Sequence, residues 1–246
     1  MGMRSLSASG LLSIWELGQH KTAAEKGLLL ISCFCPEKME SELAELSIGR
    51  RDALLLSLQE QVFGQRMEGL ATCPICGQCL EMSFSCSEIR APFEEAPERE
   101  LSVNVDGCVL SLRPPSSLDL MAISGLDDLD AATQALTKRC ILGACYQGTE
   151  TSLDQLPEAV LKAAQQRMDQ ADPQADVRLA LCCPECGHRW QEAFDILSFL
   201  WLEIVAWAYR ILNNVHTLAS AYGWSESEIL AMSPWKRQVY LNLVGQ

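Results

Sequence analysis

The segment Cys73-Pro74-Ile75-Cys76-Gly77 returns more than a hundred residues later, almost unchanged, as Cys183-Pro184-Glu185-Cys186-Gly187. Each copy is a Cys-x-x-Cys turn with proline after the first thiol and glycine after the second. Two such turns supply four thiolates, which is the ligand set of a tetrahedral structural zinc site. The spacing therefore predicts that Cys73, Cys76, Cys183 and Cys186 hold one Zn²⁺ per chain and tie the middle of the chain to its last third.

Three neighbouring residues leave the choice of ligands open. Cys79 extends the first turn, Cys182 precedes the second turn, and His188 follows Gly187, so any of them could replace one of the four cysteines. A redox-active dithiol pair and an iron–sulfur cluster are two further interpretations of the same residues. The chain lacks the βαβ context of a thioredoxin site, which makes a thiol oxidoreductase the less favoured function.

Strand and helix patterns surround the two turns. Alternation at Leu80, Met82 and Phe84 predicts a strand, and alternation on both sides of Asp106-Gly107 predicts a β-hairpin over 101–112. Apolar residues at helical spacing predict helices within 11–70, 126–142, 157–168 and 196–221. We therefore predict an α+β protein in which two distant hairpins form a zinc ribbon, with an inserted β-hairpin plus helices between them.

The same patterns divide the chain into four parts. The expected parts are an N-terminal helical part (1–68), the zinc ribbon (69–88 with 177–195), the inserted hairpin and helices (89–176) and a C-terminal helical part (196–246). Ser225-x-x-Glu228 is a capping box, and Ser233 precedes a proline at a first helical position. These signals predict two short helices after the long C-terminal one.

Charge and composition narrow the classes of partner. The chain has 19 Lys and Arg against 32 Asp and Glu, a net charge of −13. An acidic chain without a basic stripe is not steered toward phosphate backbones, so a nucleic-acid-binding zinc-ribbon regulator is the less favoured alternative. The first ten residues do not form a signal peptide, and Ile196–Tyr209 contains Glu203 and is too short to cross a bilayer. We expect a cytoplasmic protein with no membrane partner and with free or metal-bound thiols.

The sequence carries no catalytic motif. It contains no glycine-rich phosphate loop, no HExxH and no GxSxG. No group of residues supplies an acid, a base and a nucleophile together. We therefore expect no enzymatic activity and no small-molecule substrate.

Four further segments are distinctive. They are Leu46-Ser-Ile-Gly-Arg50-Arg51-Asp52-Ala53, Arg113-Pro-Pro-Ser-Ser-Leu-Asp119-Leu120, Phe194-Asp-Ile-Leu-Ser-Phe199 and the tail from His216 to Leu241. Together with the two knuckles they resemble the T-even-type baseplate hub assembly chaperone family of contractile phage tails and phage-tail-like injection systems. The resemblance implies that the protein binds a hub, spike or tape-measure component, as a transient chaperone or as a resident part of the particle.

The tail carries the residues expected to contact such a partner. Trp, Tyr and Arg are the usual anchors of protein interfaces. In the tail the candidates are Trp224, Pro234, Trp235, Arg237 and Tyr240. The alternative is that these side chains form the last layer of the protein's own core.

Overall fold

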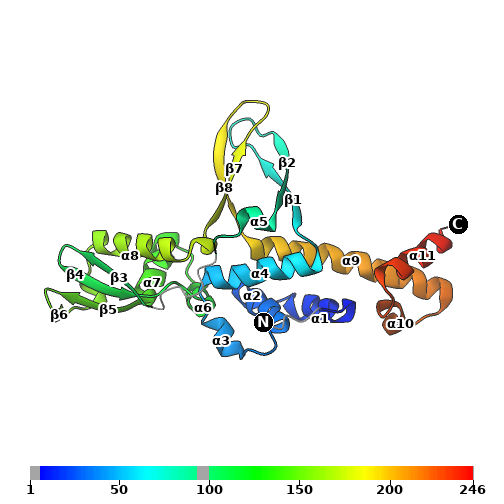
Figure 1. The fold of residues 1–246 in the computed structure, drawn as a ribbon, viewed down its shortest axis with the longest axis horizontal. Coiled ribbons are helices and arrows are strands. Elements are labelled where there is room, and N and C mark those ends of the chain that lie inside the picture. The colour runs from blue at the N-terminus through cyan, green and yellow to red at the C-terminus, as the bar shows by residue number, and fades with distance from the viewer. Residues whose placement is uncertain (1–5, 93–99, 246) are drawn as a thin grey trace.

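The computed structural model describes residues 6–92 and 100–245, and its shape is elongated (Figure 1). A body of helices lies at the centre, an insert lobe (residues 101–171) at one end and the C-terminal helices at the other. Two long β-hairpins, which together we call the stalk, project sideways from the body. The mixture of helices and small sheets confirms the predicted combination of α and β structure.

The body is built from amphipathic helices around the largest apolar core. It contains α1 (Ala8–Gly18), α2 (Ala23–Phe34), α3 (Glu40–Ala44), α4 (Ile48–Val62) and the first half of α9 (Ile196–Tyr222). Side chains of α2, α4 and α9 pack together there, and several are fully buried: Leu30, Ile31, Phe34, Leu55, Leu56 and Leu200. Burial of apolar area on this scale is the main favourable term holding the helices together.

Helix α9 runs from the body to the C-terminal end and joins the two (Figure 1). One side forms a buried seam with a helical period, which includes Leu200, Ile204, Ala208 and Ile211. The sequence led us to expect that the apolar segment Ile196–Tyr209 is too short to cross a bilayer. The helix that contains it has 27 residues and, by length and composition alone, could span a membrane, so the expected length was wrong. Contacts with α1, α2, α4, α10 and α11 bury one side of α9. Only 33% of its most apolar stretch is buried, and Leu202 and Tyr209 are exposed.

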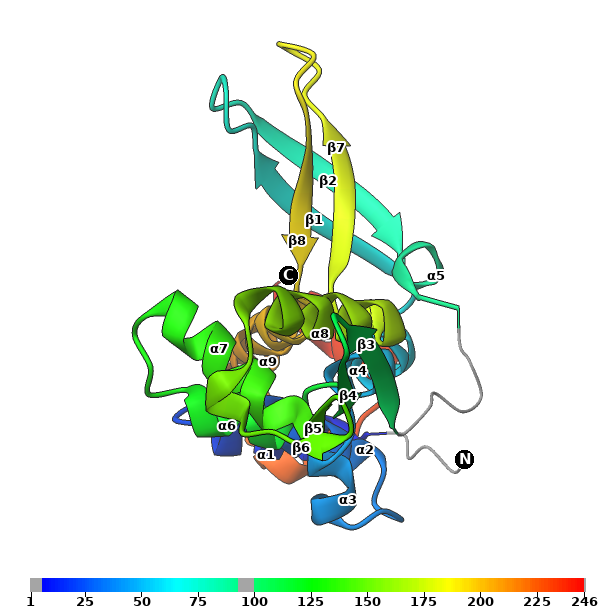
Figure 2. The ribbon, with the colours of Figure 1, turned by 90° about the vertical axis from the view of Figure 1, so that its left-hand side faces the viewer.

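The insert lobe has its own sheet and its own apolar core. Its antiparallel strand order is β3 (Leu101–Val105), β4 (Cys108–Leu112), β5 (Ile141–Tyr146) and β6 (Thr149–Glu150). The predicted hairpin is confirmed by β3 and β4. Helix α8 (Glu158–Ala171) lies over the sheet, and Val160, Ala164 and Met168 pack against it (Figure 2). The lobe also contains α6 (Ser117–Ile123), α7 (Leu129–Cys140) and η1 (Leu153–Gln155).

Two predicted helices end differently from the expectation. The helix expected over 126–142 begins as α7 at Leu129 and ends at Cys140, because Ile141 starts strand β5, which pairs with β4. Likewise Arg66–Leu70, included in the N-terminal helical stretch, belongs to strand β1. Ile141 and its neighbours gain their hydrogen bonds from β4, which is distant in the sequence, and Arg66–Leu70 gains them from β2 within the same hairpin. In both places strand pairing overrides local propensity.

A buried carboxylate fixes the exit from β4. The side chain of Asp119 accepts two hydrogen bonds from Arg113, at 2.6 and 3.0 Å, and one from Arg139, at 3.1 Å. It also accepts bonds from the backbone N–H and the hydroxyl of Ser116, both at 2.9 Å. This network ties the start of α6 to both β4 and α7.

The C-terminal helices fold back onto the end of α9. Gly223 ends α9, and α10 (Glu226–Leu230) and α11 (Pro234–Val244) follow. The capping box is present, since the N–H of Ser225 donates to Glu228 at 2.8 Å. The hydroxyl of Ser233 accepts the N–H of Lys236 at 3.2 Å. Both predicted short helices are confirmed.

Candidate metal centre

Each Cys-x-x-Cys segment forms the turn of one stalk hairpin. The first hairpin is β1 (Arg66–Thr72) with β2 (Cys79–Ser85), and the second is β7 (Val177–Cys182) with β8 (Arg189–Phe194). The two turns share the same backbone bonds. The N–H of Cys73 donates to the carbonyl of Gln78 at 2.9 Å, and the N–H of Cys183 donates to the carbonyl of His188 at 2.8 Å.

A glycine closes each turn. Gly77 and Gly187 have φ angles of +73° and +70°, which glycine adopts without steric cost. Their N–H groups donate back to the carbonyls of Cys73 and Cys183 at 3.0 and 2.9 Å. The two knuckles therefore have the same local geometry although their sequences lie far apart.

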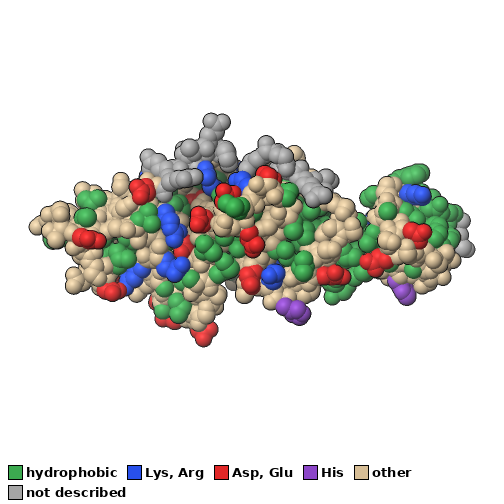
Figure 3. Space-filling view, turned by 90° about the horizontal axis from the view of Figure 1, so that it is seen from below, with side chains coloured by type: hydrophobic (Ala, Val, Ile, Leu, Met, Phe, Trp, Pro, Cys, Tyr) green, Lys and Arg blue, Asp and Glu red, His purple; other side chains and the backbone are tan. Residues whose placement is uncertain are grey.

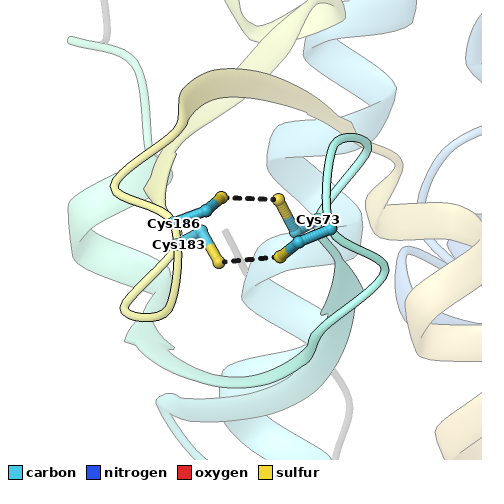
Figure 4. Close-up of side chains that lie close together, drawn as sticks. Cys73, Cys183 and Cys186 are labelled. Atoms are coloured by element: carbon cyan, nitrogen blue, oxygen red, sulfur yellow. Dashed lines mark hydrogen bonds between the residues drawn. The ribbon is translucent and has the colours of Figure 1, made fainter.

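The fold brings the four predicted cysteines together at the end of the stalk (Figure 4). The Sγ atoms of Cys73 and Cys186 are 3.7 Å apart, and those of Cys76 and Cys183 are 3.5 Å apart. All four sulfurs lie within 4.8 Å of one another. A tetrahedron with Zn–S bonds of about 2.3 Å has sulfurs about 3.8 Å apart, so the donor set fits one tetrahedral metal ion.

The electrostatics of the four thiols favour a bound cation. Hydrogen bonds from the N–H groups of Cys76 and Ile75 lower the pKa of the Cys73 thiol to about 7. For Cys76 the backbone hydrogen bond with Gln78 acts to lower the pKa, but hydrogen bonding with Cys183, desolvation and the other nearby sulfurs together raise it to about 12. Four thiolates this close repel one another, and coordination to a divalent metal offsets that repulsion.

Aromatic side chains hold the base of the stalk to the body. The ring centroids of Phe84 and Phe194, at the same position in each hairpin, are 5.2 Å apart in an edge-to-face arrangement. Phe194 also lies 5.6 Å from Phe199 on α9. All three rings pack against the core of the body. These contacts join the bases of the two hairpins to each other and to α9.

The three alternative ligands lie outside the cluster. Cys79 and Cys182 are exposed on β2 and β7, and neither belongs to the group of four sulfurs. The ring of His188 stacks on Trp190, with 5.9 Å between centroids, while its carbonyl accepts the N–H of Cys183. The structure therefore gathers the symmetric set of four cysteines and not a set with one of these replacements.

The other cysteines carry no comparable arrangement in the described part of the chain. All twelve thiols are free. Cys35, Cys86, Cys108 and Cys140 are buried in apolar surroundings. Burial raises the pKa of Cys140 to about 11, which keeps the thiol protonated and unreactive.

The five tail residues predicted to contact a partner are exposed to solvent to three different degrees. Trp235 is 78% exposed on α11, next to the exposed Pro234. Trp224 and Tyr240 are half-buried and stack edge to face with centroids 4.8 Å apart. Arg237 is only 6% exposed, and its guanidinium donates to the carbonyls of Ile229 and Met232, the end of α10 and the turn after it.

A cavity between the body and the insert lobe was not predicted from the sequence. Lys38, Arg50 and Arg113 contribute to its wall. The only signal in the sequence was that Arg50 and Arg113 belong to two of the distinctive segments, about sixty residues apart. Nothing local indicates that those segments meet.

Comparison with known proteins identifies one family. A family model described as "T4 bacteriophage base plate protein" matches residues 24–201. This range includes nearly all of α2, then α3, α4, the insert lobe and both knuckles, whereas α1 precedes it and most of α9 and the two last helices follow it. No curated protein and no solved structure matches the chain.

Proposed function

The chain belongs to the T4 bacteriophage base plate protein family, and from this premise we propose that it is a non-enzymatic assembly chaperone or structural adaptor of a contractile tail. The observation that carries the proposal is the family match over 24–201, which covers most of the chain. A baseplate-associated structural role follows from the family. The proposed partner is a hub, spike or tape-measure protein, met during assembly in the cytoplasm or in the finished particle.

The elongated shape supports a role in holding other proteins. The stalk, the insert lobe and the C-terminal helices point in three directions from the body (Figure 1). Each carries exposed apolar side chains, among them Ile75 on the stalk, Tyr146 on the insert lobe and Trp235 on α11. Several separate projections suit an adaptor that touches more than one neighbour, because each can form a small interface of its own.

We propose that the four cysteines bind one structural Zn²⁺. A site with four protein ligands leaves no position for a substrate, so the ion's contribution is to hold the tips of the two hairpins together. Cys73, Cys76, Cys183 and Cys186 would be the ligands. Their backbone N–H partners, described above, would stabilise the thiolate charge.

The C-terminal helices supply the proposed partner surface. Figure 3 shows hydrophobic side chains gathered at this end of the molecule. Trp235 is the most exposed aromatic of the tail, and Val239 and Leu243 follow it at intervals of four on the same helix. A large aromatic side chain on an exposed helical stripe is a frequent anchor of protein interfaces.

Affinity purification of the tagged protein from its native host tests this function. We expect recovery of spike, baseplate or tape-measure proteins, and we expect Trp235→Ala to reduce their recovery by about tenfold, which corresponds to about 1.4 kcal/mol. Leu202→Ala, at an exposed apolar residue of α9 outside the three projections, is the control and should leave recovery unchanged. Recovery of RNA polymerase, ribosomal proteins or nucleic acid without tail proteins would refute the proposed function.

A further inference from the structure

The cavity between the body and the insert lobe is formed by two segments that lie far apart in the sequence. The N–H of Ile48 donates to the carbonyl of Pro115 at 3.0 Å, and Ser47 and Ser116 form an isolated β-bridge. The N–H of Gly49 donates to the carboxylate of Asp172 at 2.8 Å. These bonds join the start of α4 to the exit from β4 and to the end of α8, and the cavity opens beside them.

The size and lining of the cavity suit a peptide. Its volume is about 680 Å³, within the range of about 300–1,000 Å³ common for ligand sites. Leu46, Pro114 and Ala171 supply apolar surface, and charged side chains supply the rest. A space of this size is larger than a single inorganic anion fills.

Two cations in the wall have no ion-pair partner among the described residues. Lys38 and Arg50 are half-buried, and neither side chain forms a salt bridge or hydrogen bond there. Arg113 differs, because its guanidinium already binds Asp119. Partial burial of a cation costs free energy unless an anion compensates it. Lys38 and Arg50 therefore have hydrogen-bond donors available for a carboxylate that enters the cavity.

Three acidic side chains, Glu42, Glu45 and Asp172, line the same wall, and none forms a salt bridge with Lys38 or Arg50 among the described residues. The charge of Asp172 interacts with that of Arg50, while its carboxylate accepts the N–H of Gly49. Glu42 accepts the N–H of Met39 at 3.2 Å, and both Glu42 and Glu45 are exposed. On the lower face, blue side chains group where the body and the insert lobe meet, within an otherwise mixed surface (Figure 3).

We propose that this cavity binds an acidic peptide segment of a baseplate partner, with a carboxylate of the peptide on the guanidinium of Arg50 and the ammonium of Lys38 beside it. The inference rests on the proposed function for the identity of the partner. Carboxylate is favoured because a guanidinium binds it through two parallel hydrogen bonds. The chain's net charge of −13 opposes acidic partners at long range, so the attraction is confined to this cavity.

Fluorescence polarisation with the full-length protein tests the proposal. The probes are overlapping peptides of about 12 residues that cover the baseplate and tail proteins of the same particle. The variants are Arg50→Glu and a matched control, Arg210→Glu, which makes the same charge change at an exposed site on α9. We expect the binding peptides to contain Asp or Glu, and we expect Arg50→Glu to weaken them about tenfold or more while Arg210→Glu changes them less than about twofold.

A charge exchange provides the second readout. Replacing the acidic residue of a binding peptide by Lys should weaken binding to the wild type and restore it to Arg50→Glu, as a direct pairing requires. Lys38→Glu serves as a second variant if Arg50→Glu does not fold. The proposal is overturned if no peptide binds, if Arg50→Glu and Arg210→Glu have equal effects, or if excess inorganic phosphate displaces the peptides completely.

These outcomes separate the cavity from the proposed function. If affinity purification recovers baseplate proteins but no peptide depends on Arg50 for binding, the proposed peptide site is refuted and the proposed function is still supported. Failure to recover any baseplate protein overturns the function. In that case, peptides that still depend on the charge at Arg50 would support an acidic-peptide site with a different partner.

Discussion

Replacing Cys183 by Ser should remove one ligand of the proposed zinc site and with it the link between the two hairpins. The Cys183 side chain is buried, and its sulfur lies 3.5 Å from that of Cys76. A serine hydroxyl does not ionise near neutral pH and is a poor zinc ligand. We therefore expect loss of the bound metal and a less stable fold, because metal binding by a site absent from the unfolded chain is folding free energy.

The size of the effect follows from the length of chain that the metal joins. Cys73 and Cys186 are separated by 113 positions in the sequence, and Cys76 and Cys183 are separated by 107 positions. Closing a loop of about 100 residues in the unfolded chain is worth about 4.7 kcal/mol in the chain-entropy treatment of cross-links. We expect Cys183→Ser to lower the free energy of unfolding by about 4–5 kcal/mol, and the Tm by roughly 10–20 °C.

Metal analysis and thermal unfolding under reducing conditions measure both consequences. Cys182→Ser is the matched control, since Cys182 is exposed on the adjacent position and lies outside the cluster, so its effect should stay within about 0.5 kcal/mol. A chelator should bring the wild type to the Tm of Cys183→Ser. A Cys183→Ser protein that retains one metal ion per chain and the wild-type Tm would refute the reasoning.

Two further predictions concern the insert lobe and the base of the stalk. Desolvation acts to raise the pKa of Asp119, but hydrogen bonds from Arg113 and Ser116 outweigh it and lower the pKa from 3.8 to about 2. The ionised form thus contributes about 2–3 kcal/mol of stability above pH 3.8, lost as the pH falls toward 2. Asp119→Asn should lower the free energy of unfolding by about 3 kcal/mol near neutral pH and should remove this part of the loss of stability in acid. Urea unfolding at a series of pH values measures both effects. A variant with the same acid transition as the wild type would contradict the prediction. Phe194→Ala should cost about 2–3 kcal/mol while retaining the metal, since the ligands lie at the far end of the stalk; loss of metal would show that the aromatic base also positions the tips.

Some features of this protein follow from residues within a few positions of one another. The knuckle geometry depends on the Cys-x-x-Cys-Gly order, because the backbone bonds that shape it close within one turn. The hairpin at Asp106-Gly107 and the caps at Ser225 and Ser233 are local in the same sense. The four cysteines could be chosen from twelve because their spacing is repeated.

Other features depend on which distant segments meet. Strand β5 is apolar enough to extend helix α7, and only its pairing with β4 decides the outcome. Arg237 looks like a surface anchor in the sequence, yet it is buried because the carbonyls at the end of α10 face it.

The sequence by itself thus determined the knuckles, the capped helices and the balance of α and β structure, because each rests on hydrogen bonds or periodicity within a short segment. The repeated spacing also predicted that the two knuckles meet, whereas the tertiary structure alone decided the four-stranded order of the insert lobe and the cavity that holds Lys38 and Arg50. The physical reason is that burial and charge compensation depend on neighbours brought together from distant parts of the chain, and no local pattern records them.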